Sequence, residues 1–343
     1  MSWVPLLLAD PSPCLRRQVL RDLLKKPDND PEVIELTSLL ELDPLVQDLL
    51  NLQNTDGSWR TRDGVGDSWR NIRNTANALI RLGYFDIHKE HPAVRKGVEY
   101  LFKEQQSDGS WPLPASKAER EFREPYTMIP LQTAIPLYSL AAVGYATDPR
   151  SEKAYEWLIG VRLEDGAWPS GKKAEKHVFP AGYRRLANSR FGCRSNTTYA
   201  LCALAYHPHR RESPHARSGL DILLAQETYN EYSLGVEVAR MVGVEKQSGF
   251  FTYFARNDPA LLLDLCWRVK ANLEDERVRA LFAFVVELQG QYGLWETPSY
   301  PRISRWLSYD LLRSLSRINE STDWVSSQPR TIFQPYPKGD RRY

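Results

Sequence analysis

Two aspartates in apolar surroundings are the residues of this sequence best suited to acid–base chemistry. Asp264 lies in a run of four leucines and a cysteine at positions 261–266, and Asp310 directly follows Tyr309. Burial disfavours the charged form of a carboxyl group, so its pKa rises and it can hold a proton near neutral pH. Either side chain is therefore a candidate catalytic acid. The structural alternative is that each carboxylate is the hydrogen-bond or arginine partner of a neighbour.

A second candidate site combines arginines with aromatic and amide side chains. Its members are Trp69, Arg70, Arg73, Asn74, Arg194, Asn196, Tyr199, Arg302, Arg305, Trp306 and Tyr309. Arginine binds phosphate or carboxylate groups through paired hydrogen bonds, and aromatic rings pack against apolar groups. The set predicts a site for an amphipathic ligand with an anionic head. The alternative is that the arginines pair with Asp67, Glu124, Asp258 and Asp310 and hold the fold closed.

The sequence predicts no metal and no cofactor. His207, His209 and His215 fall in a polar segment next to two arginines, which favours a solvated loop over a metal cluster. The four cysteines are widely separated and form no Cys-x-x-Cys pair. This pattern is typical of a reduced protein, and we expect a cytoplasmic location.

A repeated signature indicates how these side chains are positioned. An apolar run ends in Gln or Arg, and Gly and Trp follow four and six residues later. The copies are Gln53, Gly57 and Trp59; Gln105, Gly109 and Trp111; Arg162, Gly166 and Trp168; and Gln289, Gly293 and Trp295. We expect a tight turn at each Gly and a structural Trp that packs on the next unit. The period of ~50–65 residues also predicts a degenerate copy at Gln226–Tyr232.

Helices of two kinds alternate along the chain. Apolar inner helices are predicted at Pro13–Leu24, Ser68–Leu82, Tyr126–Val143, Cys193–Tyr206, Pro259–Val269 and Ser304–Ile318. Amphipathic outer helices are predicted to begin at Asp30-Pro31, His91-Pro92, Asp148-Pro149, Ser213-Pro214 and Glu274-Asp275, since Pro suits the first helical turn. Six such hairpins predict an all-α toroid, (α/α)6, with a degenerate last outer helix. We expect residues 1–320 to form this single domain and residues 321–343 to be an irregular tail.

Composition restricts the possible partners. The chain has 343 residues and a net charge of +2, which argues against a general nucleic-acid binder. No apolar run reaches the ~18 residues that a membrane-spanning helix needs. The oligomeric state cannot be read from these features.

The repeat resembles the QW motif of squalene and oxidosqualene cyclases. Lys96-Gly97, Tyr100-Leu101, Gln105, Gly109 and Trp111 match the motif throughout, and the copy ending at Trp168 has Arg162 in place of Gln. The resemblance extends over about residues 40–318. It implies the toroid shared by terpenoid cyclases and protein prenyltransferases, with a central cavity that opens where the inner helices begin.

The catalytic motifs of that superfamily are missing from the sequence. It contains neither the Asp-x-Asp-Asp acid of class II cyclases nor the Asp-Asp-x-x-Asp magnesium motif of class I synthases. Asp264-Leu265-Cys266 is similar to part of the prenyltransferase zinc site, but all six histidines precede it, and alternate helical residues point to different faces.

The resemblance therefore leaves more than one function open. It implies a protein that binds or transforms an isoprenoid or another amphipathic anionic ligand in its cavity. The alternatives are a non-catalytic toroid for ligand binding or protein interaction, and another reaction in the same cavity, such as a lyase or a carbohydrate-active enzyme.

Overall fold

The computed structural model describes residues 3–59, 68–111, 113–114, 126–127, 130–169, 186, 188–225, 230–245, 257–297 and 299–319. Only the backbone is described at residues 68–70 and in the two short strands. The tail expected at 321–343 lies outside the described residues.

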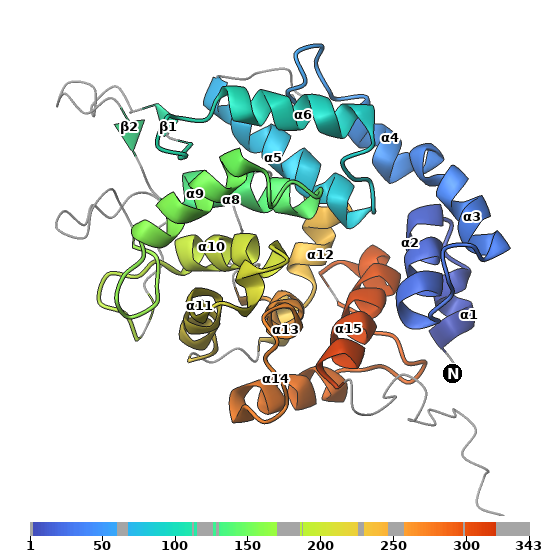
Figure 1. Cartoon of the computed structure of the whole chain (residues 1–343). Helices are drawn as coiled ribbons and strands as arrows, with labels where there is room; N and C mark the ends of the chain where they lie inside the picture. Colours follow the sequence, from blue (N-terminus) through green and yellow to red (C-terminus); the bar gives the residue numbers. More distant parts are fainter. Residues whose placement is uncertain are drawn as a thin grey trace, which may run out of the picture.

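The described elements are almost all helices (Figure 1). In chain order they are α1 (Trp3–Leu8), α2 (Pro13–Gln18), η1 (Val19–Leu23), α3 (Pro31–Ser38), η2 (Leu40–Leu42), α4 (Pro44–Leu50), α5 (Ser68–Tyr84), α6 (Pro92–Lys103), β1 (Leu113–Pro114), β2 (Tyr126–Thr127), α8 (Pro130–Ala142), α9 (Pro149–Gly160), α10 (Arg194–Tyr206), η3 (Arg210–Glu212), α11 (Pro214–Leu224), η4 (Glu231–Ser233), α12 (Val236–Met241), α13 (Pro259–Arg268), α14 (Glu276–Glu287), η6 (Pro301–Ile303) and α15 (Ser304–Ile318).

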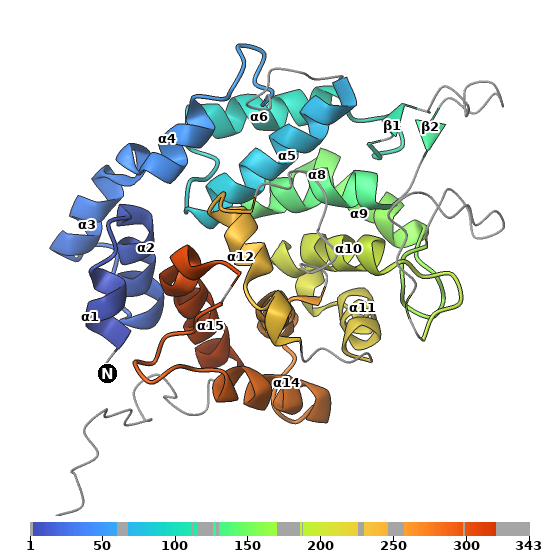
Figure 2. The ribbon, with the colours of Figure 1, turned by 180° about the vertical axis from the view of Figure 1, so that it is seen from behind.

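The helices form two concentric layers of an α/α toroid. The inner layer consists of six members: α2 (which continues into η1), α5, α8, α10, α13 and α15. From α5 to α15, each inner helix packs against the next inner helix along the chain. Helices α6, α9, α11 and α14 lie outside them, each packed against the inner helix that precedes it (Figures 1 and 2). This architecture confirms the fold class predicted from the sequence.

The inner helices match their predicted ranges closely, with one difference. The third was expected to begin at Tyr126, but α8 begins at Pro130, because Tyr126 and Thr127 pair with Pro114 and Leu113 in a two-stranded antiparallel ladder. Nearly every residue of α8 and α10 is buried, as expected for helices with apolar side chains on most faces.

The outer helices begin at their predicted positions because a polar side chain satisfies their first N–H groups. The N-cap residues Asp30, His91, Asp148, Ser213 and Asp275 each accept a hydrogen bond from a backbone N–H of the first turn. In all of these helices except α14, a proline follows the N-cap.

Each Trp of the repeat joins its own outer helix to the inner helix that follows. The four side chains are all buried, at Trp59, Trp111, Trp168 and Trp295. Their indole N–H groups donate to the carbonyls ten residues earlier, at Leu49, Leu101, Leu158 and Val285, over 2.7–2.8 Å. Their backbone N–H groups donate to hydroxyl oxygens of the next inner helix, at Thr75, Thr133, Thr197 and Ser308, over 2.8–3.1 Å. We call each such pair of bonds a tryptophan anchor; it gives the repeated Trp a structural role.

The first residue of the repeat ties the turn together. The Nε2 group of the glutamine donates to the carbonyl of the turn glycine in three copies, over 2.6–3.1 Å, and these pairs are Gln53 with Gly57, Gln105 with Gly109, and Gln289 with Gly293. In the copy that has Arg162 instead, the guanidinium donates to the Ser218 hydroxyl of α11 over 2.7 Å. Gln53 and Gln105 also donate to the next outer helix, at the carbonyls of Ala93 and Arg150. Arg162 therefore keeps the contact with the next outer helix and lacks a described bond within the turn.

The glycine of the repeat is required by its backbone conformation and by close packing. All four copies have a positive φ, from +76° to +98°, at Gly57, Gly109, Gly166 and Gly293. A Cβ at Gly109 would lie 2.8 Å from the backbone of Lys153 in α9, and one at Gly57 would meet the backbone of Lys96 in α6. Side chains rarely adopt this left-handed conformation, so only glycine lets these turns contact the next outer helix. The tight turn predicted at each Gly is confirmed.

The region of the expected degenerate repeat folds differently. Residues 226–229 lie outside the described residues, but 230–245 form η4 and the short helix α12. Helix α12 lies inside the ring (Figures 1 and 2), where Met241 accepts a hydrogen bond from Arg81 of α5. Gly235, at its start, packs against Ile303 and Leu307. An interior helix was not expected from the sequence.

Candidate functional site

A polar pocket lies at the C-terminal ends of the inner helices. It has a volume of about 260 Å³, and all six inner helices contribute to its wall. The lining residues are Gln18, Arg21, Asp22, Ile80, Gly83, Tyr84, Asp86, Tyr138, Tyr206, Arg268, Tyr309 and Arg313. We call it the central pocket. The sequence analysis placed the site at the opposite ends of these helices.

Asp310 lies behind the wall of this pocket, where it contacts Tyr84 and Arg313, which line it. Its Oδ2 accepts a 3.0 Å hydrogen bond from the Tyr84 hydroxyl, and its Oδ1 is 2.9 Å from Nη2 of Arg313. Burial raises the pKa of Asp310 to about 6, even though Arg313 favours the charged form. The carboxyl group can therefore gain or lose a proton near neutral pH.

Asp264 lies close to the same arginine but has the opposite electrostatic character. Its carboxylate is 2.7 Å from Nε of Arg268 and 3.3 Å from Nη2 of Arg313, and it also accepts from the Trp267 indole. Burial acts to raise its pKa, but the two guanidinium groups hold the pKa below its usual value. We expected burial to raise the pKa of Asp264. That expectation was wrong, because the charges of Arg268 and Arg313 outweigh the effect of burial.

Four tyrosines give the pocket an aromatic, hydroxyl-rich wall. The rings of Tyr138 and Tyr206 meet edge to face at 4.9 Å, and the Arg268 guanidinium lies 3.7 Å from the centre of the Tyr206 ring. The Tyr309 hydroxyl donates to Asp22 over 2.5 Å. Burial raises the pKa of Tyr206 to about 12, so its hydroxyl stays protonated and can donate a hydrogen bond.

The predicted arginine-rich set is only partly brought together. Tyr309 lies at the central pocket, and Trp306 packs against Tyr84 in the ring wall. Arg302 is exposed, and Arg305 makes a 3.4 Å ion pair with Asp10. The side chains of Trp69 and Arg70, and the acids Asp67 and Glu124 proposed as arginine partners, lie outside what is described.

The remaining members of that set lie on α5 and α10. Asn196 is held in the framework, since it accepts from the Leu131 backbone N–H and donates to the Pro169 carbonyl. Arg194, Tyr199 and Asn74 are buried, and Arg73 is partly buried. A ligand-binding role for this set stays a prediction.

Asp258, the third acid considered, is a structural residue. Its carboxylate accepts hydrogen bonds from the backbone N–H groups of Gly235, Glu237 and Ala260 over 2.8–2.9 Å. It thereby joins the start of α13 to α12. The sequence-based alternative had paired this carboxylate with an arginine.

The histidine segment is better ordered than a solvated loop. His207 is 1% exposed, its Nε2 is 2.8 Å from Glu152, and its Nδ1 accepts from the backbone N–H groups of His209 and Arg210. Burial lowers the pKa of His207. Within the described ranges no group of three His, Cys, Asp or Glu side chains could hold a metal ion, and Cys266 is fully buried.

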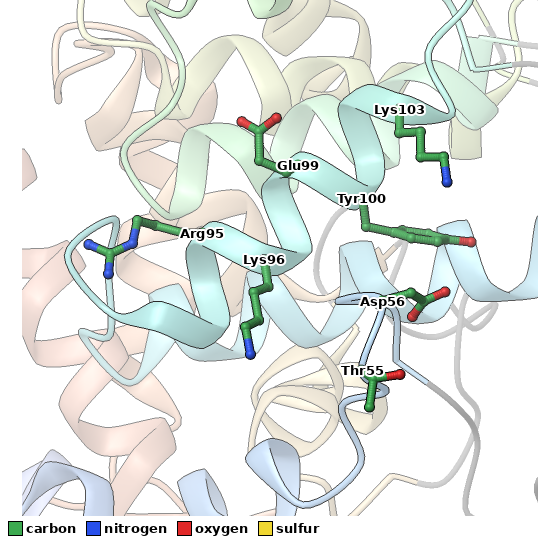
Figure 3. Close-up of a pocket in the computed structure, with 7 residues that line it drawn as sticks. All are labelled: Thr55, Asp56, Arg95, Lys96, Glu99, Tyr100 and Lys103. Atoms are coloured by element: carbon green, nitrogen blue, oxygen red, sulfur yellow. The ribbon is translucent and has the colours of Figure 1, made fainter.

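A second hollow lies on the outside of the ring (Figure 3). This outer groove of about 390 Å³ is lined by Thr55, Asp56, Arg95, Lys96, Glu99, Tyr100 and Lys103. Figure 3 shows Arg95 and Lys103 pointing away from each other, so the cations do not converge on one ligand. Asp56 already accepts from the Ser58 hydroxyl and backbone N–H. We assign no ligand to this groove.

Comparison with known proteins agrees with the fold. Residues 40–206 match the family model of the squalene–hopene cyclase C-terminal domain. The chain is thus similar to the cyclase toroids over just under half of its length. It is similar to the squalene–hopene cyclases of Zymomonas mobilis, at 34% identity over 122 residues, and Bradyrhizobium diazoefficiens, at 27% over 167 residues. These matches cover 35% and 48% of this chain but only 18% and 24% of the cyclases.

Solved structures also resemble the chain, at low similarity. A protein from Actinoplanes is 15% identical with a TM-score of 0.33 and coverage of 82% of this chain and 99% of that one. The type II terpene cyclase MstE from Scytonema is 15% identical with a TM-score of 0.32, covering 83% and 97% of the two chains.

Several pocket residues were missed by the sequence analysis, although signals for two of them exist. Arg268 follows Asp264 by four residues, and Arg313 follows Asp310 by three, which are the spacings that let oppositely charged helical residues pair. Tyr84 lies just beyond the predicted end of its helix at Leu82, so it was not considered. No local signal marks Tyr138 or Gln18, because only the closed ring brings them to the pocket.

Proposed function

We propose that this toroid binds an isoprenoid or a similar amphipathic molecule and that the polar end of the ligand enters the central pocket. We further propose that Asp310 is the proton source for a transformation of that end. The observation that carries the proposal is the buried, titratable carboxyl group of Asp310, located where all six inner helices meet. The match to squalene–hopene cyclases over residues 40–206 supports an isoprenoid as the substrate class.

The proton would reach the ligand through Tyr84. Tyr84 lines the pocket and contacts Asp310, whereas Asp310 lies behind it. In its protonated form, the Asp310 carboxyl can donate to the Tyr84 oxygen, which frees the Tyr84 proton to point into the pocket. In this scheme Tyr84 is the residue that touches the substrate, and Asp310 supplies the proton and becomes a carboxylate.

Asp264 is not the acid in this scheme. Its two arginine partners keep it charged, so it instead holds Arg268 and Arg313 at the pocket wall.

The four free cysteines are all buried, in keeping with the cytoplasmic location expected from the sequence.

The proposal is tested by incubating the full chain with squalene and with geranyl, farnesyl and geranylgeranyl diphosphates and alcohols. Native mass spectrometry detects bound ligand, and gas chromatography–mass spectrometry detects products. We expect binding and conversion by the natural sequence. Tyr84→Phe and Asp310→Asn should retain binding and lose at least ~100-fold in turnover, the contribution typical of a positioned proton donor.

Two other outcomes have distinct meanings. Binding without conversion by the natural sequence would favour a non-catalytic binding toroid. One observation favours that second function: Asp310 already pairs with Arg313 and Tyr84, as a structural carboxylate would. Failure to bind any of these compounds would overturn the isoprenoid proposal.

A further inference from the structure

We infer that the central pocket selects a neutral alcohol head and rejects an anionic one. This inference rests on the proposed function, in which the pocket holds the polar end of the ligand. It replaces the anionic head expected from the sequence.

The first argument is that the arginines of the pocket wall already have carboxylate partners. Arg313 is 2.9 Å from Asp310, and Arg268 is 2.7 Å from Asp264. Arg21 is 2.9 Å from Asp86 and also pairs with Asp28, over 2.7 Å. A diphosphate would therefore have to displace a protein carboxylate or bring unbalanced negative charge into a half-enclosed pocket, and either is costly.

The second argument concerns the hydrogen-bonding groups that remain unused. Gln18 lines the pocket and is 7% exposed, and its Nε2 donates to the Tyr84 carbonyl. Its Oε1 has no hydrogen-bond partner among the described residues, and neither does Nε of Arg313. The wall thus offers one unmet acceptor and one unmet donor, each costly when buried without a partner.

A hydroxyl group can meet either need. It donates one hydrogen bond and accepts up to two, so it suits the Gln18 acceptor as well as the Arg313 donor. A phosphate or carboxylate at neutral pH has only acceptors to offer. It would leave the Gln18 oxygen unmet and would also face Asp22, which lines the same wall.

The size of the pocket agrees with a small head. About 260 Å³ is below the ~300–1,000 Å³ usual for sites that enclose a whole drug-sized ligand. The pocket therefore fits a hydroxyl group and the first few carbons of its chain.

The test compares ligands that differ only in the head. Binding of farnesol, farnesyl diphosphate and the hydrocarbon β-farnesene to the full chain is measured by isothermal titration calorimetry. The tail-free pair prenol and dimethylallyl diphosphate is measured in the same way. We expect each alcohol to bind about tenfold or more tightly than its diphosphate, as expected when an unmet buried polar group gains a partner.

Gln18→Met should weaken farnesol binding about tenfold and leave β-farnesene binding unchanged, because it removes the amide with little change of size. Gln47→Met, at an exposed position on α4, is the matched control, and thermal unfolding verifies that both variants fold.

Tighter binding of the diphosphates, or no effect of Gln18→Met on farnesol binding, would overturn this inference and leave the isoprenoid proposal standing. If prenol binds in a Gln18-dependent way and no farnesyl compound binds, the inference stands and the isoprenoid proposal fails. If no compound binds, both fail.

Discussion

At the scale of single residues, two aspartates that share one arginine have opposite pKa shifts. Asp310 contacts one guanidinium and a tyrosine hydroxyl, whereas Asp264 lies between two guanidinium groups. The apolar sequence around Asp264 correctly predicted burial. The pairing with Arg268, four residues later, could have been predicted from the spacing, but the pairing with Arg313 could not, because Arg313 reaches Asp264 from a different helix.

This difference predicts opposite pH dependences of stability for two matched variants. The folded-state pKa of Asp310 is raised to about 6 from 3.8, so its stabilising contribution is present below about pH 4 and is lost as the pH rises through 6. Asp310→Asn removes that dependence. Its unfolding free energy should therefore improve relative to the natural sequence, by roughly 1–3 kcal/mol, as the pH rises from about 4 to 7.

Asp264→Asn should show the reverse trend. The pKa of Asp264 is lowered in the folded state, so its stabilising contribution is present above pH 3.8 and is lost as the pH falls below that value. Urea unfolding of both variants at a series of pH values measures the two slopes. Parallel slopes would contradict the assignment of opposite charge states.

The tryptophan anchors can also be tested at a single residue. Thr197→Val keeps the shape of the side chain but removes the hydroxyl that accepts from the Trp168 backbone N–H. Because that buried N–H is then left without its partner, we expect a loss of ~1–3 kcal/mol in unfolding free energy. Thr55→Val, at an exposed position, is the control and should change stability by less than ~0.5 kcal/mol. Equal effects would show that the anchor contributes no specific stability.

At the scale of elements, the sequence predicted the inner and outer helices well because local signals define their ends. The N-caps, the first-turn prolines and the repeated Gly are all visible without a structure. Helix α12 was missed because it is short and its position depends on the ring around it. The pocket was missed for a similar reason, since its residues come from the later turns of six separate helices.

Two glycines near helix α9 provide a matched pair at this scale. Gly109→Ala places a Cβ 2.8 Å from the Lys153 backbone at a φ of +95°, so it should destabilise the fold by more than ~1 kcal/mol. A Cβ at Gly160, the last residue of α9, meets nothing within 4 Å. Gly160→Ala should therefore stabilise the fold by ~0.4–1 kcal/mol. Thermal unfolding compares the two, and a stabilising Gly109→Ala would contradict the required left-handed turn.

At the scale of the whole molecule, the described closure of the ring between α15 and the first helices has ion pairs but no tryptophan anchor. Arg305 of α15 pairs with Asp10, which lies between α1 and α2, over 3.4 Å, and Tyr309 donates to Asp22 of η1. Arg17 and Arg21 continue the contact to Asp86, just after α5. Elsewhere in the described ring, ion pairs such as Arg150 with Glu99 and Arg217 with Asp275 also join neighbouring units, but the tryptophan anchors add buried neutral hydrogen bonds to these contacts.

Salt should therefore loosen the closure before it affects the anchored units. The Arg305 side chain is 38% exposed, and about 1 M salt reduces the screening length to ~3 Å. We expect faster hydrogen exchange in α1 and α2 at high salt, with little change in α8 and α10. Arg305→Gln should show the faster exchange already at low salt. A uniform response of all helices would contradict this prediction.

The tryptophan anchors have a consequence for how such a protein can change size. Each anchor joins only units that are adjacent in the chain, and the first and last described units meet at a separate, ionic contact. A gene duplication or deletion of one complete hairpin would leave every other anchor intact. Only the closure would have to adapt to the new circumference. The diameter of the central space is thus set by the number of hairpins, so its capacity can change in whole-repeat steps during evolution.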